Sequence, residues 1–97
     1  MKPVDLLPAA RQEYDQSFDW YAQRSTLAAE RFERAVNEAL RSIAADPERY
    51  AAVTPHHRAC RVERFPYRVI YQIEPHRILV VAVAHAKRRP SYWKHRA

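Results

Sequence analysis

The sequence contains no glycine, and this absence excludes two large classes of nucleotide-binding protein. The phosphate-binding loop and the dinucleotide-binding fingerprint both need glycines where the backbone approaches phosphate groups. Only one cysteine is present, Cys60, so no internal disulfide framework can form and a reducing cytoplasm is expected. No run approaches the roughly 20 apolar residues that cross a bilayer, and no signal-peptide segment opens the chain, so we expect no membrane association.

Conventional enzyme signatures are also missing. No nucleophile elbow is present, and Cys60 has no sequence context that would activate a thiolate, so we expect it to pack as a small buried residue. His56 and His57 are adjacent, which directs their side chains to opposite sides of an extended chain. Neither a second cysteine nor a spaced carboxylate completes a ligand set with His85. We therefore expect no metal site and no cofactor.

Charge is divided unevenly along the chain. Residues 1–57 carry seven Lys/Arg and nine Asp/Glu, whereas residues 58–97 carry ten and two, a net charge of +8 in the second part. This asymmetry favours an anionic partner, either nucleic acid or an acidic protein segment. A basic surface without a dedicated partner is the alternative. With 97 residues, the chain is expected to form a single domain over residues 1–97.

Two strands joined by a tight turn are predicted in the second half. Apolar and polar residues alternate from Tyr67 to Glu74, a pattern typical of a strand with one buried face, although Ile70 breaks the alternation, so the second face is not wholly polar. The segment Glu74–Arg77 predicts a type I turn, because Pro75 presets φ at its second position. Residues 78–84 are all apolar, so we expect a strand inside the sheet, covered on both faces and paired on both edges.

Two helices are predicted in the first half. Residues 9–24 carry an apolar stripe at intervals of four, four and three, and a second helix follows Ser25 or Thr26 as its N-cap. The second helix has the strongest periodicity in the chain and ends at Asp46, because the residue before a proline is disfavoured in the α region. The link between the helices is short, so they are expected to form an antiparallel hairpin.

Two further strands complete the predicted fold. They cover residues 2–7, where Pro3 suits a sheet edge, and residues 59–65, while residues 47–58 are expected to be an irregular connector. The last eight residues are too short for a stable element, although Tyr92 and Trp93 are suitable anchors. The expected fold is α+β, in the order βααβββ, with the helical hairpin on one face of a four-stranded antiparallel sheet.

Arginines in the basic half are the residues most suited to chemistry. Arg61, Arg68 and Arg88 are predicted at the ends or on the faces of neighbouring strands, and arginine matches phosphate geometry with a fork of donors. RNA can be cut without a metal by attack of its own 2′-hydroxyl, provided that cations stabilise the charge developing on phosphorus. A proton donor and acceptor are also needed. The candidates for these roles are Glu63, His85 and Tyr92.

Five segments together resemble the RelE/ParE superfamily of bacterial type II toxins, and the resemblance covers nearly the whole chain. These segments are LLPAARQEYDQSFDWYAQRS, DPERY, CRVERF, PYRVIYQIE and RILVVAVAHAKRRPSYW. The resemblance implies the βααβββ fold, growth inhibition by the free toxin, and a cognate antitoxin as partner. Trp20 and Trp93 are candidate anchors for that partner, and packing within the monomer is the alternative for both.

The superfamily contains two mechanisms, and the resemblance leaves both open. RelE-like members cut messenger RNA on the ribosome, and by motif position Arg61, Arg68, Arg88 and Tyr92 match their catalytic residues. Glu63 departs from that pattern, because the RelE-like branch tends to place a cation there. ParE-like members poison DNA gyrase without such a set. A stand-alone nucleic-acid-binding module and a degenerate, non-toxic family member are the alternatives.

Overall fold

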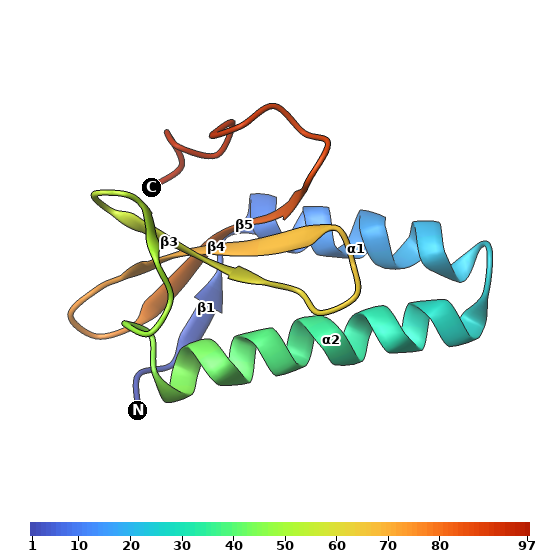
Figure 1. The fold of residues 1–97 in the computed structure, drawn as a ribbon, viewed down its shortest axis with the longest axis horizontal. Helices are drawn as coiled ribbons and strands as arrows, with labels where there is room; N and C mark the ends of the chain where they lie inside the picture. The colour runs from blue at the N-terminus through green and yellow to red at the C-terminus, as the bar shows by residue number, and fades with distance from the viewer.

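The chain starts with a short strand, continues through two long helices and ends with four more strands. The computed structural model describes residues 1–97, with elements β1 (Val4–Leu6), α1 (Pro8–Ala22), α2 (Thr26–Ala45), β2 (Ala52–Thr54), β3 (His57–Arg61), β4 (Tyr67–Ile73) and β5 (Ile78–His85). The helices lie side by side and run in opposite directions, as Figure 1 shows. The predicted α+β class and the helical hairpin are confirmed.

Local chemistry explains where both helices begin and where α2 ends. Pro8 opens α1 at a position where a missing N–H costs little. Ser25 caps α2, and its hydroxyl accepts a hydrogen bond of 3.2 Å from the Ala28 N–H. Helix α2 ends at Ala45, immediately before the Asp46-Pro47 pair. The predicted boundaries therefore hold to within about two residues, which is the usual uncertainty of helix ends.

The sheet differs from the prediction in strand number and direction. It has five strands in the order β1-β5-β4-β3-β2, whereas four were expected. The additional strand, β2, lies in the connector that was expected to be irregular; its three residues are too few to show a period. The sheet was also expected to be wholly antiparallel, but β1 runs parallel to β5. As predicted, β5 lies inside the sheet and the Pro3 end of the chain lies at an edge.

The second of the four predicted strands, which corresponds to β3, is shorter than expected and begins earlier. It was expected over residues 59–65, whereas β3 covers residues 57–61. Arg64 has a φ of 68°, in the left-handed region that a strand cannot use, so the chain turns before β4. Phe65 then packs against the helices, with its ring 5.4 Å from that of Phe32.

Each face of the sheet has its own apolar cluster. The face beneath the helices buries side chains from both helices and from β3, β4 and β5, including Phe32, Val36, Ile43, Val69, Tyr71 and Val80. The opposite face buries Ile70, Leu79, Val81, Ala82, Ala84 and Trp93. In Figure 1 the C-terminal segment folds back across this second face, away from α2. This segment supplies the cover that the two-faced apolar strand β5 requires.

Neither helix is of the kind that spans a membrane. Neither α1 nor α2 combines the length and the apolar composition that a bilayer-spanning helix needs.

Candidate functional site

Arg61 and Arg68 lie directly opposite each other on neighbouring strands. They are register partners in the antiparallel pair β3–β4, so their side chains project from the same face of the sheet. This is the face opposite the helices, because their neighbours Cys60 and Val69 belong to the core beneath the helices. Both arginines are exposed, and neither forms an ion pair with a carboxylate. Like charges placed opposite each other repel, so this pair is suited to binding an anion.

The remainder of that face is covered by the C-terminal segment. Trp93 is 2% exposed and packs on Ile70 and Ala84, which belong to β4 and β5. Its ring also lies 4.8 Å from the ring of His57, nearly edge-on. Trp93 therefore packs within the monomer and is not available as an anchor for a partner.

Glu13 is the residue that holds the C-terminal segment in place. Its side chain, on α1, is only 12% exposed, and it accepts two hydrogen bonds of 3.1 Å from the Arg96 guanidinium. It also accepts one of 2.7 Å from the Tyr92 hydroxyl and one of 3.0 Å from the Val83 N–H. Arg88 lies 3.8 Å from the same carboxylate. One largely buried carboxylate thus connects α1, β5 and the C-terminal segment.

A bulge in β5 explains why the backbone needs these side-chain partners. Ile70 pairs with Ala82 and Tyr71 pairs with Val80, so Val81 is an extra residue that interrupts the ladder. Strand β1 ends near this point, where the Leu7 N–H donates to the Val80 carbonyl. The Arg96 guanidinium donates a hydrogen bond of 3.0 Å to the Val81 carbonyl, and the Glu13 carboxylate accepts one from the Val83 N–H. These two side chains satisfy backbone groups that β1 is too short to reach.

Arg88 and Tyr92 form the second pair among the predicted site residues. The Arg88 guanidinium lies 4.0 Å from the centre of the Tyr92 ring, and both residues contact Glu13. Burial raises the pKa of Tyr92, and the hydrogen bond to the Glu13 carboxylate raises it further. The hydroxyl is therefore protonated and donating. No hydrogen bond or ion pair connects this pair with Arg61 and Arg68.

The two candidate general bases lie in different surroundings. Glu63 is exposed in the turn after β3 and lines surface hollows beside α2. His85 ends β5 opposite Tyr67, with the two rings 4.9 Å apart, and its Nδ1 accepts a hydrogen bond from the Lys87 N–H. Neither side chain forms a hydrogen bond or ion pair with Arg61 or Arg68.

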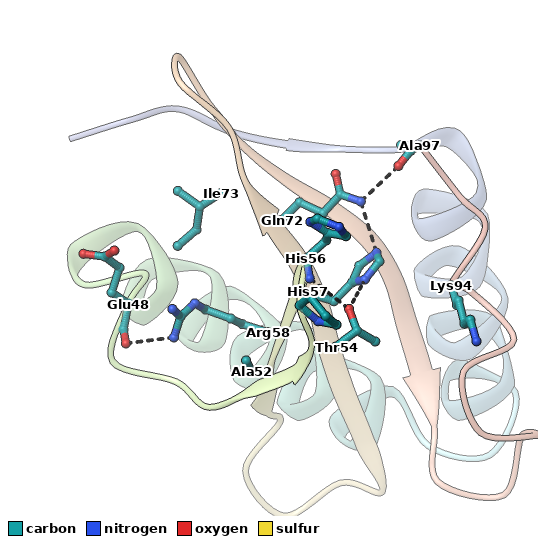
Figure 2. A pocket seen from close by; sticks show the side chains of 11 residues that line it. Glu48, Ala52, Thr54, His56, His57, Arg58, Gln72, Ile73, Lys94 and Ala97 are labelled. Atoms are coloured by element: carbon teal, nitrogen blue, oxygen red, sulfur yellow. Dashed lines mark hydrogen bonds between the residues drawn. The ribbon is translucent and has the colours of Figure 1, made fainter.

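A surface hollow of about 630 Å³ lies at the other end of β3 and β4 from Arg61 and Arg68, and Figure 2 shows its lining. The buried His57 ring is hydrogen-bonded at both nitrogens, to Thr54 at 2.7 Å and to Gln72 at 3.1 Å. The Gln72 amide donates to Nε2 and also to the Ala97 carbonyl, so Nδ1 carries the ring proton. Burial lowers the pKa of His57, and His56 lowers it further. This network supports the end of the C-terminal segment.

Two of the residues considered for metal or thiol chemistry, His57 and Cys60, are buried. Cys60 is buried, and burial raises the pKa of its thiol, which favours the unreactive protonated form. No group of three or more His, Cys, Asp or Glu side chains lies close enough together to hold a metal ion.

Glu13 was not among the residues predicted for the site. It lies three residues after the buried Ala10, at helical spacing from the apolar stripe of α1. A carboxylate at the margin of a buried stripe requires a partner, and this is the signal that the sequence contained. The partners themselves lie 70 to 83 residues away and were not identifiable from it.

Comparison with known proteins agrees with the fold. Among curated proteins none matches the sequence. A structure described as a chromosomal ParDE TA system from P. aeruginosa is similar with a TM-score of 0.77 and 15% identity, covering 90% of this chain and 98% of that one. The YoeB dimer from Staphylococcus aureus is similar with a TM-score of 0.61 and 15% identity, covering 87% and 95%. At these identities the likeness concerns the fold alone.

The sequence itself matches a family model over most of its length. The model describes the ParE toxin of the type II toxin-antitoxin system parDE, and it matches residues 4–90. The match includes both helices, all five strands and the basic segment that follows β5. The chain therefore belongs to the ParE toxin family, within the RelE/ParE superfamily whose pattern its sequence resembles.

Proposed function

We propose that this chain is the toxin of a type II toxin-antitoxin module, that it acts in the cytoplasm by poisoning DNA gyrase, and that a cognate antitoxin neutralises it. Membership of the ParE toxin family supports the assignment as a toxin. The choice of gyrase depends mainly on one observation, the binding of Tyr92 and Arg88 to Glu13.

Cleavage of RNA needs groups that are free to act on the reacting atoms. A metal-independent site requires a proton donor, a proton acceptor and cations directed at one phosphate. The Tyr92 hydroxyl donates a hydrogen bond to Glu13, and Arg88 is stacked on Tyr92 and lies near the same carboxylate. Two of the four residues that match RelE-like catalytic positions thus serve to attach the C-terminal segment. This arrangement favours a toxin that acts by binding.

Arg61 and Arg68 have a different role in this proposal. Both are exposed, and both project from the same face without a carboxylate partner. We assign them to bind an anionic group, either on the target or on the antitoxin. The high positive charge of residues 58–97 supports this assignment, because it attracts anionic partners from a distance.

Ribosome-dependent cleavage of messenger RNA is the second candidate, and the Arg61–Arg68 pair is the observation that favours it. Two adjacent arginines on an open sheet face are suited to a phosphate, and Tyr92 would complete a RelE-like set if it left Glu13 on the ribosome. In that mechanism, Arg61, Arg68 and Arg88 stabilise the charge on the phosphate and Tyr92 donates a proton.

Side-by-side assays after induced expression test the proposal. We expect growth arrest, inhibited supercoiling by purified gyrase, and intact translated message in primer-extension mapping. We expect Tyr92→Phe to retain toxicity and Arg68→Ala to lose it, with Arg41→Ala as a control because Arg41 is an exposed arginine on α2. If wild-type toxin cleaves message and the Tyr92→Phe variant does so at a rate lower by roughly 100-fold or more, the nuclease mechanism would be favoured. Binding to bare nucleic acid without growth arrest would instead indicate a stand-alone binding module.

A further inference from the structure

The two tryptophans occupy opposite environments. Trp93 is 2% exposed beneath the C-terminal segment, whereas Trp20 on α1 is 51% exposed. A single exposed aromatic side chain needs no explanation by itself, since folded proteins show many apolar atoms to water. The surroundings of Trp20 distinguish it from such a residue.

Trp20 is held in a fixed orientation although it is exposed. The Arg24 guanidinium lies 3.5 Å from the centre of the Trp20 ring and donates a hydrogen bond of 2.8 Å to the Trp20 carbonyl. On α1, the Tyr21 ring meets that of Trp20 edge-on at 5.0 Å. A side chain that is already ordered loses little conformational entropy when a partner binds.

Trp20 also borders a hollow of about 610 Å³. Its lining comes from α1 on one side and from the start of β4 and the end of β5 on the other, with Tyr21, Pro66, Tyr67 and Ala86 as its apolar part. The Tyr21 ring lies 6.5 Å from that of Tyr67, so an aromatic surface continues from Trp20 into the sheet. The hollow thus offers a partly apolar floor beside an exposed tryptophan.

The lining of this hollow contains a cation and no carboxylate. Its lining contains Lys87 and no aspartate or glutamate, whereas each of the four other sizeable hollows contains at least one carboxylate. Lys87 and the nearby Arg89 are exposed and form no ion pair, and Arg24 adds a third cation beside the ring. An apolar floor with cations at its margin is complementary to an acidic segment with a bulky apolar residue.

We propose that this hollow, lined by Trp20, Tyr21, Pro66, Tyr67 and Lys87, is the docking surface for an acidic, amphipathic segment of the antitoxin. The inference rests on the proposed function, because it takes its partner from the toxin-antitoxin assignment. A bulky apolar side chain of the segment packs between Trp20 and Pro66, and its carboxylates approach Lys87 and Arg24. The Trp20 ring is the main contact, since tryptophan is enriched among residues that dominate binding energy.

Matched pairs of variants test this surface. The protein encoded by the neighbouring gene is the probe, and its affinity for the full-length toxin is measured by titration calorimetry. We expect Trp20→Ala to weaken binding by roughly 30-fold or more. Leu27 is 52% exposed on α2 outside the hollow, so Leu27→Ala is the control, with a change within about threefold. Lys87→Glu should weaken binding and slow association, whereas Lys94→Glu, outside the hollow, should do neither.

A second measurement uses the wild-type interface. Toxin labelled with 5-fluorotryptophan gives two ¹⁹F signals, and we expect antitoxin to shift the Trp20 signal and shield it from a soluble paramagnetic probe. Tight binding with the Trp20 signal unshielded, or with Trp20→Ala and Leu27→Ala equally affected, would overturn the docking surface and leave the toxin assignment intact. No antitoxin binding together with no growth arrest would overturn both. Shielding by a single-stranded RNA oligonucleotide, and not by antitoxin, would identify a nucleic-acid surface and overturn the inference.

Discussion

The Glu13 carboxylate and the Arg96 guanidinium form two hydrogen bonds of 3.1 Å each, although the residues are 83 positions apart in the chain. Their side chains are 12% and 25% exposed, so this ion pair is largely shielded from water. Charge-assisted, bidentate bonds of this kind are stronger than ordinary surface ion pairs. The pair makes the C-terminal segment a fixed part of the sheet's second face.

Replacing Glu13 with Gln should detach the C-terminal segment. Removing one partner of a buried ion pair leaves the other charge poorly compensated, so we expect the free energy of unfolding to fall by about 2–4 kcal/mol. Amide hydrogen exchange should accelerate at Lys94 and Arg96, whose N–H groups bond within the segment. Asp15→Asn is the control, because Asp15 forms only an exposed ion pair with Arg11 and should cost less than about 0.5 kcal/mol. Unchanged exchange in the Glu13 variant would contradict this role.

Arg61→Thr should separate function from stability. Threonine favours strands, and the change removes repulsion from Arg68 directly opposite. We therefore expect urea denaturation to give an unfolding free energy unchanged or raised by up to about 0.5 kcal/mol, while toxicity on induction is lost. A loss of more than about 1 kcal/mol would mean that Arg61 stabilises the fold, and the toxicity result would then carry no weight.

Stability should depend on the protonation of His57. Its folded-state pKa lies below the ordinary value of 6.5, because burial and His56 disfavour the charged ring. As pH falls, the unfolded state therefore binds the proton before the folded state does. The contribution of the neutral His57 ring to the free energy of unfolding is complete above pH 6.5 and is lost as pH falls through the folded-state pKa. Thermal unfolding across that range should show a shallower decline for His57→Gln than for the wild type. His56→Gln is the control, and an equal change in both variants would refute the assignment.

Core substitutions in α2 should differ according to burial. Phe32 is fully buried, and its ring lies within 5.6 Å of those of Tyr14, Tyr21, Phe65 and Tyr67. Phe32→Ala should cost about 3–5 kcal/mol of unfolding free energy. Leu40 is only partly buried against the same cluster, so Leu40→Ala should cost about 2 kcal/mol or less. Equal losses in chemical denaturation would show that the packing around Phe32 is looser than described.

Periodic, locally encoded features were predictable from the sequence. The apolar stripe of α2, its Ser25 cap and its end before Pro47 all depend on residues within a few positions of one another. The interior position of β5 followed from an apolar run that needs cover on both faces. The exposed and buried tryptophans were not predictable in this way, because each depends on which distant segment covers it.

Features that depend on distant contacts were missed or left open. Strand β2 is three residues long, and Val53 at its centre is 40% exposed, so no hydrophobic pattern marks it. The parallel pairing of β1 with β5 depends on the path of the whole helical hairpin. The pairing of Arg88 and Tyr92 with Glu13 required knowledge of how the C-terminal segment returns to α1.

The attachment of residue 96 to residue 13 also has a consequence for synthesis of the protein on the ribosome. The chain emerges from its N-terminus, so both helices leave the ribosome first, whereas β4, β5 and the C-terminal segment leave it later and close together. Until Trp93 docks, the apolar cluster around Ile70 and Ala84 remains open to water. The toxin therefore carries an exposed apolar surface until the segment that contains Trp93 docks, which makes this stage prone to aggregation or to capture by a chaperone.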